Sequence, residues 1–293
     1  LDPVVLGLVL HNFAGFYNMP YFTSLGWQLV VIALLFILAN RFSKARRAAE
    51  YLNIHLQDEV NDRTKDWEIA YSFKPMSGVS RDLYDFFTEG SKFNGLALFD
   101  VSGHGISSGL VTMLAKDVVV RNFTADMSIK FGNVMKKIND AIVEEKGDIE
   151  NYLTGLLLRV SGNKVQFINA GHPAVFLRTA ANGKCYPVQL LVKEASTSMF
   201  GGIIGIPGME VDFSAVQFNM AAGDALIMYT DCLSESLNKE GEQYSQNKIA
   251  RSFENSGNGN ADSKLKKVLD DFYDYTDNVP LKDDLTVIVL QKK

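Results

Sequence analysis

The apolar positions of the chain follow three patterns, one after another. Residues 21–39 form a continuous apolar run of 19 residues, about the length that a helix needs to cross a bilayer. Residues 43–68 contain no Gly or Pro, and their apolar residues recur at near-heptad spacing. Farther along, short apolar segments that end in turn residues are mixed with segments of helical periodicity. The pattern predicts membrane segments in residues 1–42, a linker helix over 43–68 and a folded domain over 69–293.

Within and just before the folded domain, the apolar segments predict strands at 67–75, 83–90, 95–102, 152–162, 164–171, 174–179, 185–192, 211–219, 224–231 and 285–291. Helices are predicted at 105–125, 128–146, 246–256 and 262–276. Several strands follow one another without a helix between them. This order indicates an α+β fold with antiparallel sheets rather than a doubly wound fold.

The apolar run of residues 21–39 has flanks that are typical of a membrane helix. Aromatic residues stand near its beginning, and the basic cluster "NRFSKARR" follows it, which indicates that the chain emerges on the cytoplasmic side. A signal peptide would carry its basic residues before the apolar run, whereas a buried core helix is the other alternative. Because the chain does not begin with Met, we interpret it as part of a longer protein of the inner or cytoplasmic membrane, with the folded domain in the cytoplasm.

The predicted linker helix carries a narrow apolar stripe made of Ala45, Ala48, Leu52, Leu56 and Val60. A stripe of this width suits a two-stranded coiled coil better than a globular core. We therefore expect residues 43–68 to support a homodimer, with a solvated spacer helix as the alternative.

Net charge bears on the class of binding partner, and cysteine content bears on the redox compartment. The net charge of −5 argues against nucleic acid as the main partner, because no large basic surface is available. The two cysteines, Cys185 and Cys232, show neither metal-site spacing nor a disulfide framework, which fits a reducing compartment.

Aspartates recur at the ends of the predicted strands: Asp82, Asp100, Asp231, Asp283 and Asp284. Since the rest of each strand is apolar, a sheet would bring these carboxylates to one edge. Clustered carboxylates repel one another and require cations, and Mg²⁺ and Mn²⁺ prefer oxygen ligands. Such a site is therefore predicted, although strand-end aspartates also serve as ordinary turn and cap residues.

The segments "FDVSGHGISSG", "INAGHPAVFLR", "GDALIMYTDCLSES" and "KDDLTVIVL", in this order, resemble the SpoIIE-like (RsbU-type) branch of the PPM superfamily. This superfamily comprises metal-dependent serine/threonine protein phosphatases, and the resemblance extends over residues 69–293. It implies an α-β-β-α sandwich of two antiparallel sheets flanked by helices, with the metal site in a cleft at one end.

By this resemblance, the catalytic and metal-binding aspartates would be Asp82, Asp100, Asp231 and Asp283. Asp100 would bridge two divalent cations, Mn²⁺ or Mg²⁺, and the backbone carbonyl of Val101 would add a ligand. Asp284 and His104 would lie just outside the direct ligands. We interpret Asp85 and His172 as structural residues.

Two positions depart from the family pattern. Arg81 replaces the glycine that usually precedes the first aspartate, and it would either displace Asp82 or bind the substrate phosphate through its guanidinium. Cys232 replaces the glycine that usually follows the third aspartate and could alter the turn that presents Asp231.

The resemblance implies a membrane-anchored phosphatase that acts on phosphoserine or phosphothreonine of a regulatory protein, such as an anti-sigma-factor antagonist. Hydrolysis would proceed by attack of a metal-bridged hydroxide, without a covalent intermediate. The main alternative is a catalytically silent module of the same fold that binds a partner. A nucleotide-binding ATPase is disfavoured, because no P-loop lysine follows the glycines of "GHGISSG".

Overall fold

The computed structural model describes residues 30–33, 64–76, 80–191 and 202–293. The chain divides into two compact units, Leu1–Ile54 and His55–Lys293. In the first unit, residues 30–33 are helical. The predicted boundary at residue 42 and the apolar stripe between residues 45 and 60 lie outside the described residues, so the boundary and the homodimer stay predictions.

None of the helices in the described ranges combines the length and the apolar character that a membrane crossing requires. Apart from residues 30–33, the predicted span over residues 21–39 lies outside these ranges. The membrane segment therefore stays a prediction.

The linker helix predicted over residues 43–68 is wrong at its C-terminal end. Residues 64–66 are not helical, and strand β1 (Trp67–Lys74) begins where the helix was expected to end. The Thr64 hydroxyl donates a hydrogen bond to the Trp67 carbonyl (2.8 Å), and Trp67 pairs with Lys292 at the far end of the chain. The pairing buries the Trp67 ring, which leaves it 2% exposed, and this long-range contact decides the local structure.

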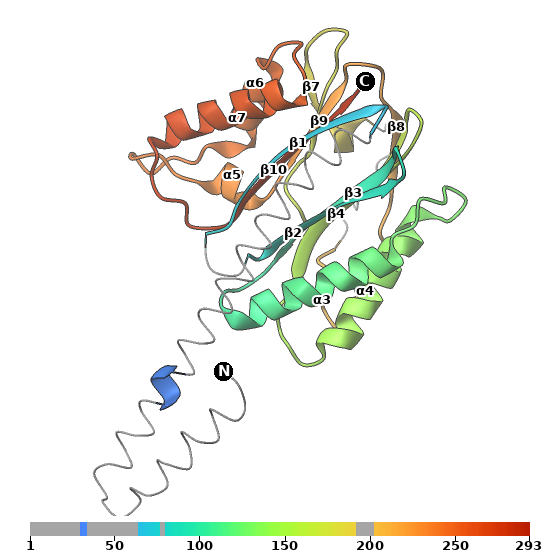
Figure 1. The fold of residues 1–293 in the computed structure, drawn as a ribbon, viewed down its shortest axis with the longest axis vertical. Coiled ribbons are helices and arrows are strands. Elements are labelled where there is room, and N and C mark those ends of the chain that lie inside the picture. Colours follow the sequence, from blue (N-terminus) through green and yellow to red (C-terminus); the bar gives the residue numbers. More distant parts are fainter. Residues whose placement is uncertain (1–29, 34–63, 77–79, 192–201) are drawn as a thin grey trace, which may run out of the picture. The chain divides into compact units, whose positions relative to one another are not determined.

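Two antiparallel five-stranded sheets form the centre of the second unit and pack face to face (Figure 1). The first sheet has the order β1, β10 (Leu285–Lys292), β9 (Ala225–Tyr229), β6 (Phe176–Arg178) and β7 (Cys185–Pro187). The second has the order β2 (Asp82–Glu89), β3 (Lys92–Val101), β4 (Leu153–Ser161), β5 (Lys164–Ala170) and β8 (Val216–Asn219). The predicted antiparallel α+β sandwich is confirmed.

Strand β3 explains why the strands have nearly continuous apolar sequences. Leu96 and Leu98 point into the core between the two sheets, whereas Ala97 and Phe99 point toward the helices on the other face. Successive side chains of a strand alternate between the faces of a sheet, and here both faces are covered. The strand is therefore apolar at almost every position.

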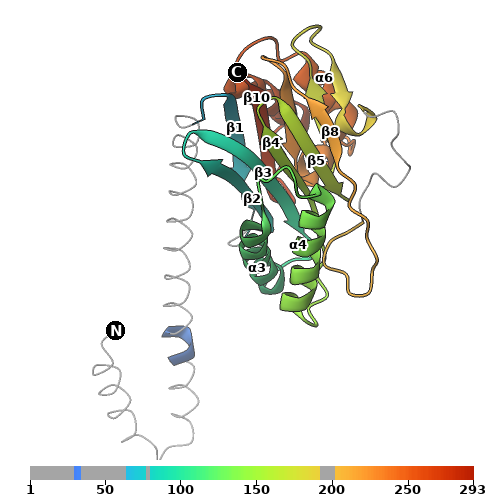
Figure 2. The same cartoon turned by 90° about the vertical axis from the view of Figure 1, so that its right-hand side faces the viewer.

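Helices cover the outer face of each sheet. α3 (Ile106–Asn122) and α4 (Phe131–Lys146) lie side by side on the second sheet (Figure 2). On the first sheet lie α5 (Asp231–Glu235), α6 (Ser245–Glu254) and α7 (Ala261–Thr276) (Figure 1). The four predicted helices are present, and α5 is an additional helix that is too short to show a periodic pattern.

Two predicted strands, at 185–192 and 211–219, lose more than half of their expected length. After β7, residues Val188–Leu190 form a 3₁₀ turn, and the Val188 amide donates to the Val175 carbonyl (2.9 Å) instead of continuing a strand. Before β8, Phe213 is buried against α4, where a side chain at Gly132 would collide with the Phe213 carbonyl. Packing against a helix thus replaces strand pairing over residues 211–215.

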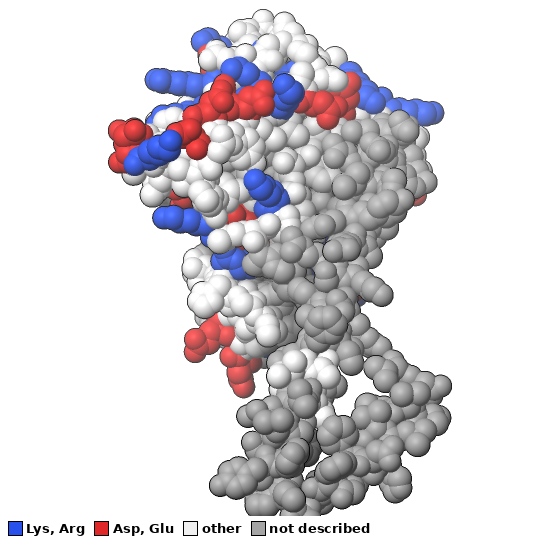
Figure 3. All heavy atoms as spheres, turned by 60° about the vertical axis from the view of Figure 1, so that its left-hand side comes forward, with Lys and Arg blue, Asp and Glu red and all other residues white. Residues whose placement is uncertain are grey.

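Charged side chains of both signs form a band across the face shown in Figure 3. The outer side of α7 contributes ion pairs four residues apart, between Lys266 and Asp270 (3.3 Å) and between Lys267 and Asp271 (2.6 Å). Such pairs stabilise a helix by a few tenths of a kcal/mol each, about 0.2–0.5. The helix is therefore amphipathic, with its apolar side on the sheet.

Candidate active site

The predicted carboxylates come together at one end of the sandwich. Asp82, at the start of β2, pairs directly with Asp100 near the end of β3, and directly opposed residues have Cα atoms about 4.5–5.5 Å apart. On the other sheet, Asp231 follows β9 and Asp283 precedes β10. The charges of Asp231 and Asp283 both act on Asp100, so the ends of the two sheets form a single acidic cluster.

Asp82 connects the two sheets. It is 5% exposed, and its Oδ2 accepts hydrogen bonds from the hydroxyls of Thr230 (2.9 Å), which directly follows β9, and Thr286 (2.5 Å), which lies in β10. Burial raises the pKa of Asp82 well above its ordinary value, and the charge of Asp100 raises it further, against the effect of the two hydroxyls. The two hydroxyls thus fix the Asp82 carboxylate at a buried position where ionisation is unfavourable.

Asp100 lies at the centre of the cluster. Its Oδ1 is buried and has no hydrogen-bond partner among the described residues. Burial, together with the charges of Asp231 and Asp283, raises the pKa of Asp100 to about 7, with Arg81 opposing the shift. A buried carboxylate oxygen without a partner, surrounded by like charges, is suited to bind a cation.

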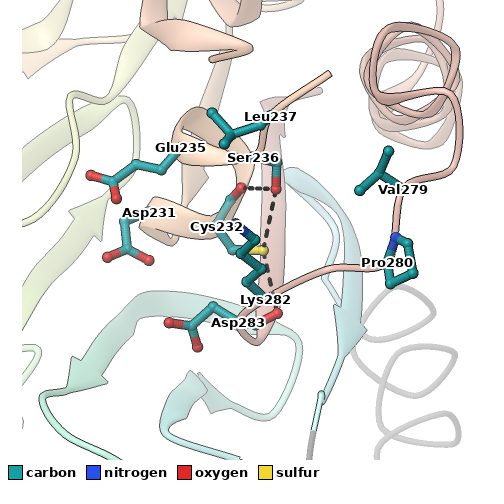
Figure 4. A pocket seen from close by; sticks show the side chains of 9 residues that line it. All are labelled: Asp231, Cys232, Glu235, Ser236, Leu237, Val279, Pro280, Lys282 and Asp283. Carbon is teal, nitrogen blue, oxygen red and sulfur yellow. Dashed lines mark hydrogen bonds between the residues drawn. The ribbon is translucent and has the colours of Figure 1, made fainter. Parts of the chain in front are cut away.

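Cys232 connects the segments that carry Asp231 and Asp283. Its thiol donates to the Asp283 carbonyl (3.3 Å), and its own carbonyl accepts from the Ser236 hydroxyl (2.7 Å) (Figure 4). Burial raises the pKa of the Cys232 thiol to about 12, so the thiol stays protonated and can donate at physiological pH. The cysteine therefore holds the two acidic segments together.

A pocket of about 190 Å³ opens beside Asp231 and Asp283. In Figure 4 the carboxylates of Asp231, Glu235 and Asp283 point to the same side, and Val279 and Pro280 lie on the opposite side. The charge of Glu235 contributes to the raised pKa of Asp231, after burial and the charge of Asp283. Glu235 was not predicted from the sequence, although its spacing of four residues from Asp231 places the two on one face of a helix.

Asp284 holds the segment that leads to Asp82. It is 2% exposed and accepts hydrogen bonds from the Met76 amide (2.6 Å), the Ser80 hydroxyl (3.0 Å) and the Arg81 amide (2.6 Å). Its two oxygens are therefore occupied within the protein. Asp284 positions its neighbours rather than offering free oxygens to a ligand.

The Arg81 side chain points into the acidic cluster. Its guanidinium forms an ion pair with the Asp283 carboxylate and donates a hydrogen bond to the Gly103 carbonyl. The bulk of Arg81 does not displace Asp82, which keeps its pairing with Asp100. Arg81, which departs from the family pattern, therefore lies at the predicted site.

A glycine-rich turn follows Asp100 and Val101 and leads into α3. Gly103 has a φ of 87°, and a Cβ atom there would lie 2.7 Å from the Asn151 amide nitrogen, so a larger residue does not fit. The Val101 amide donates to the Arg81 carbonyl (3.2 Å), and His104 lies exposed in the turn. The turn thus places Val101 and His104 next to the acidic cluster.

A sequence profile of the family described as Stage II sporulation protein E (SpoIIE) matches residues 94–293. The chain belongs to the SpoIIE family. The predicted resemblance to the SpoIIE-like branch of the PPM phosphatases is thereby confirmed.

Two curated relatives resemble this SpoIIE-family chain. The phosphoserine phosphatase RsbP of Bacillus subtilis is 28% identical over 117 residues, which cover 39% of this chain and 28% of RsbP. Protein IcfG of Synechocystis is 22% identical over 255 residues, which cover 78% of this chain and 38% of IcfG. The chain thus spans less than two fifths of the length of either relative.

Solved structures confirm the fold. The SiaA-PP2C domain of Pseudomonas aeruginosa superposes with a TM-score of 0.69 at 16% identity, and covers 88% of this chain and 98% of that domain. The catalytic domain of the serine/threonine phosphatase PstP, in complex with two manganese ions, has a TM-score of 0.54 at 14% identity, and covers 78% of this chain and 98% of that domain. The SpoIIE-family chain therefore has the PP2C fold.

The acidic cluster fits divalent cations by chemistry and charge. Its donors are carboxylate oxygens, and the buried Oδ1 of Asp100 lacks a partner among the described residues. Burial, followed by the charges of neighbouring carboxylates, raises the pKa values of Asp100 and Asp231. As the side chains stand, no three His, Cys, Asp or Glu residues within the described ranges are arranged to hold a metal ion. The fit to a cation therefore rests on the type of donor and on the unpartnered Oδ1 of Asp100.

His172 and Asp85 occupy structural positions near the site. His172 is 3% exposed, its amide donates to Asn169 Oδ1 (2.8 Å), and its Nδ1 is hydrogen-bonded to the Thr154 hydroxyl (3.0 Å). Burial lowers the pKa of His172 to about 3, so the imidazole is neutral at physiological pH. Asp85 lies farther along β2, opposite Ala97, outside the acidic cluster.

Proposed function

We propose that the folded domain is a protein phosphatase that removes phosphate from phosphoserine or phosphothreonine of a regulatory protein. The observation that carries this proposal is the cluster of Asp82, Asp100, Asp231 and Asp283 at the end of a SpoIIE-family sandwich. The relative RsbP, which is named a phosphoserine phosphatase, supports the type of substrate. Within this class, an anti-sigma-factor antagonist is the substrate that the family resemblance favours.

In the proposed mechanism, Asp100, Asp231 and Asp283 hold the cations, with Asp82 and the Val101 carbonyl as further ligands. When bound, two divalent cations supply positive charge to the phosphoryl oxygens and lower the pKa of water. Thr230 and Thr286 fix the orientation of the Asp82 carboxylate.

The protein part of the substrate needs a surface beside the phosphorylated residue. In our proposal, the pocket lined by Leu237, Val279 and Pro280 receives the residue next to the phosphorylated one. Its walls are apolar on one side and acidic on the other, so it would accept a mainly apolar side chain while the phosphate lies at the carboxylates.

A phosphatase assay on the full chain tests the proposed function. With Mn²⁺ or Mg²⁺ we expect hydrolysis of p-nitrophenyl phosphate and release of phosphate from a phosphorylated anti-sigma-factor antagonist, and with EDTA we expect neither. A folded, metal-loaded chain that hydrolyses neither compound would instead support the catalytically silent module. Hydrolysis of p-nitrophenyl phosphate alone would retain the phosphatase and reject the named substrate.

We propose further that residues 21–39 anchor the chain in the cytoplasmic membrane, with the folded domain in the cytoplasm. The apolar run and the basic cluster after it support this proposal. We expect the full chain to sediment with membranes and to resist carbonate extraction, whereas a chain beginning at residue 43 stays in the supernatant. Equal partitioning of the two chains would contradict the anchor.

A further inference from the structure

The guanidinium of Arg81 is placed where it neutralises the acidic cluster. It pairs with the Asp283 carboxylate, and the two side chains are 22% and 29% exposed. Burial alone would lower the pKa of Arg81, but the hydrogen bond and charge of Asp283, together with the charges of Asp100 and Asp284, raise it overall. Arg81 also opposes the raised pKa values of Asp100 and Asp231. Its positive charge therefore acts on Asp100, Asp231 and Asp283.

The backbone of Arg81 is fixed, whereas its side chain has access to solvent. The Arg81 amide donates to Asp284 Oδ2 (2.6 Å), and the Arg81 carbonyl accepts from the Val101 amide (3.2 Å). The Thr112 hydroxyl also donates to this carbonyl (3.4 Å). Because the guanidinium is partly exposed, it can leave Asp283 by side-chain rotation alone, without any change in the strands.

The other contacts of the cluster are part of its framework. Asp82 Oδ2 is bound by two threonine hydroxyls, and Asp284 accepts from two backbone amides and a serine. Breaking those bonds would disturb the sheet ends. The ion pair between Arg81 and Asp283 is the contact that can be released at low cost, since partly exposed ion pairs contribute little to stability.

We propose that Arg81 is a built-in counter-cation that competes with the divalent metal for Asp283. In the metal-free protein, its guanidinium neutralises the Asp283 carboxylate. When a metal binds, Arg81 must release this carboxylate, so the measured metal affinity is lower than the carboxylates alone would give. The inference rests on the proposed function only in that Asp100, Asp231 and Asp283 hold the metal.

Isothermal titration of the full chain with Mn²⁺, without substrate, tests the competition. Arg81→Met keeps the aliphatic part of the side chain but removes its charge and donors. We expect this variant to bind Mn²⁺ about fivefold more tightly, as the loss of a competing ion pair of about 1 kcal/mol predicts. Without metal, the melting temperature of this variant should be lower than that of the unchanged protein, because Asp283 loses its counter-charge. Addition of Mn²⁺ should raise the melting temperature of the variant more than that of the unchanged protein.

Lys282→Met is the matched control. Lys282 is exposed and precedes Asp283 directly, so this change also removes one positive charge close to the same carboxylate. We expect it to alter Mn²⁺ affinity less than twofold and to leave the metal-free melting temperature unchanged. Circular dichroism verifies that both variants are folded.

The outcomes separate the inference from the proposed function. Equal Mn²⁺ affinity in the unchanged protein and Arg81→Met would overturn the competition, and so would an equal gain in Arg81→Met and Lys282→Met, which would indicate a general charge effect. If no folded version bound Mn²⁺, the metal site itself would fail, and with it both the inference and the proposed function.

Discussion

Replacing Asp100 by Asn is expected to reduce phosphatase activity by about a thousandfold or more. In the proposed mechanism the Asp100 carboxylate holds the cations, and metal ions contribute several kcal/mol of charge stabilisation in the transition state, where 1.36 kcal/mol corresponds to tenfold in rate. The rate of phosphate release at saturating Mn²⁺ measures the loss. Activity within threefold of the unchanged protein would contradict the central role of Asp100.

The same substitution is expected to preserve the fold. Because burial and the neighbouring aspartates raise the pKa of Asp100 to about 7, the folded protein disfavours its charged form, and a neutral Asn removes repulsion. The melting temperature of Asp100→Asn in EDTA at pH 8 should therefore equal or exceed that of the unchanged protein. Asp85→Asn, a matched change on the adjacent strand outside the cluster, should leave activity close to normal.

Asp284→Ala is expected to lower the free energy of unfolding by about 3 kcal/mol or more. The change removes the acceptor for the Met76 and Arg81 amides and the Ser80 hydroxyl, which form three partly buried hydrogen bonds, and each such bond contributes about 0.5–1.5 kcal/mol. Chemical denaturation in EDTA measures this loss. The variant should also lose activity, because the segment that carries Asp82 is no longer held.

The neighbouring Asp283→Ala serves as the comparison. Asp283 is partly exposed and pairs with Arg81, so its loss should cost about 1 kcal/mol or less in stability. Activity should nevertheless fall as strongly as in Asp284→Ala, because the proposed metal loses a ligand. If Asp283→Ala destabilised the protein more than Asp284→Ala, the assignment of the two carboxylates would have to be exchanged.

Most strands could be predicted because local sequence determines them. β3 and β10 are apolar runs that end at charged or turn residues. Because both faces of these strands are buried, the continuous apolar run identifies them without an alternating apolar and polar pattern. The end of the linker helix could not be predicted. Helical periodicity continues past residue 64, but the partner of Trp67 is Lys292, and such a long-range pairing leaves no local signal.

The aspartates of the candidate site could be predicted, because they stand at the ends of strands. The aspartates were found because each terminates or precedes an apolar segment, and their family resemblance suggested their roles. Sequence alone did not reveal that Asp82 faces Asp100, since register depends on the whole hairpin. The family resemblance gave Asp283 and Asp284 different roles, but the sequence did not reveal that Asp283 pairs with Arg81 or that Asp284 binds the Met76 amide.

The hydrogen bonds from Thr230 and Thr286 to Asp82 join residues that are 148 and 204 positions apart in the chain. Contacts of such separation carry a large loop-closure entropy and form only after the intervening segments are in place. A nascent chain that has built one sheet therefore has only part of the acidic cluster. Because β10 lies between β1 and β9, the acidic cluster is complete only when β10 has paired, and in the proposed mechanism a chain without β10 cannot hydrolyse its substrate.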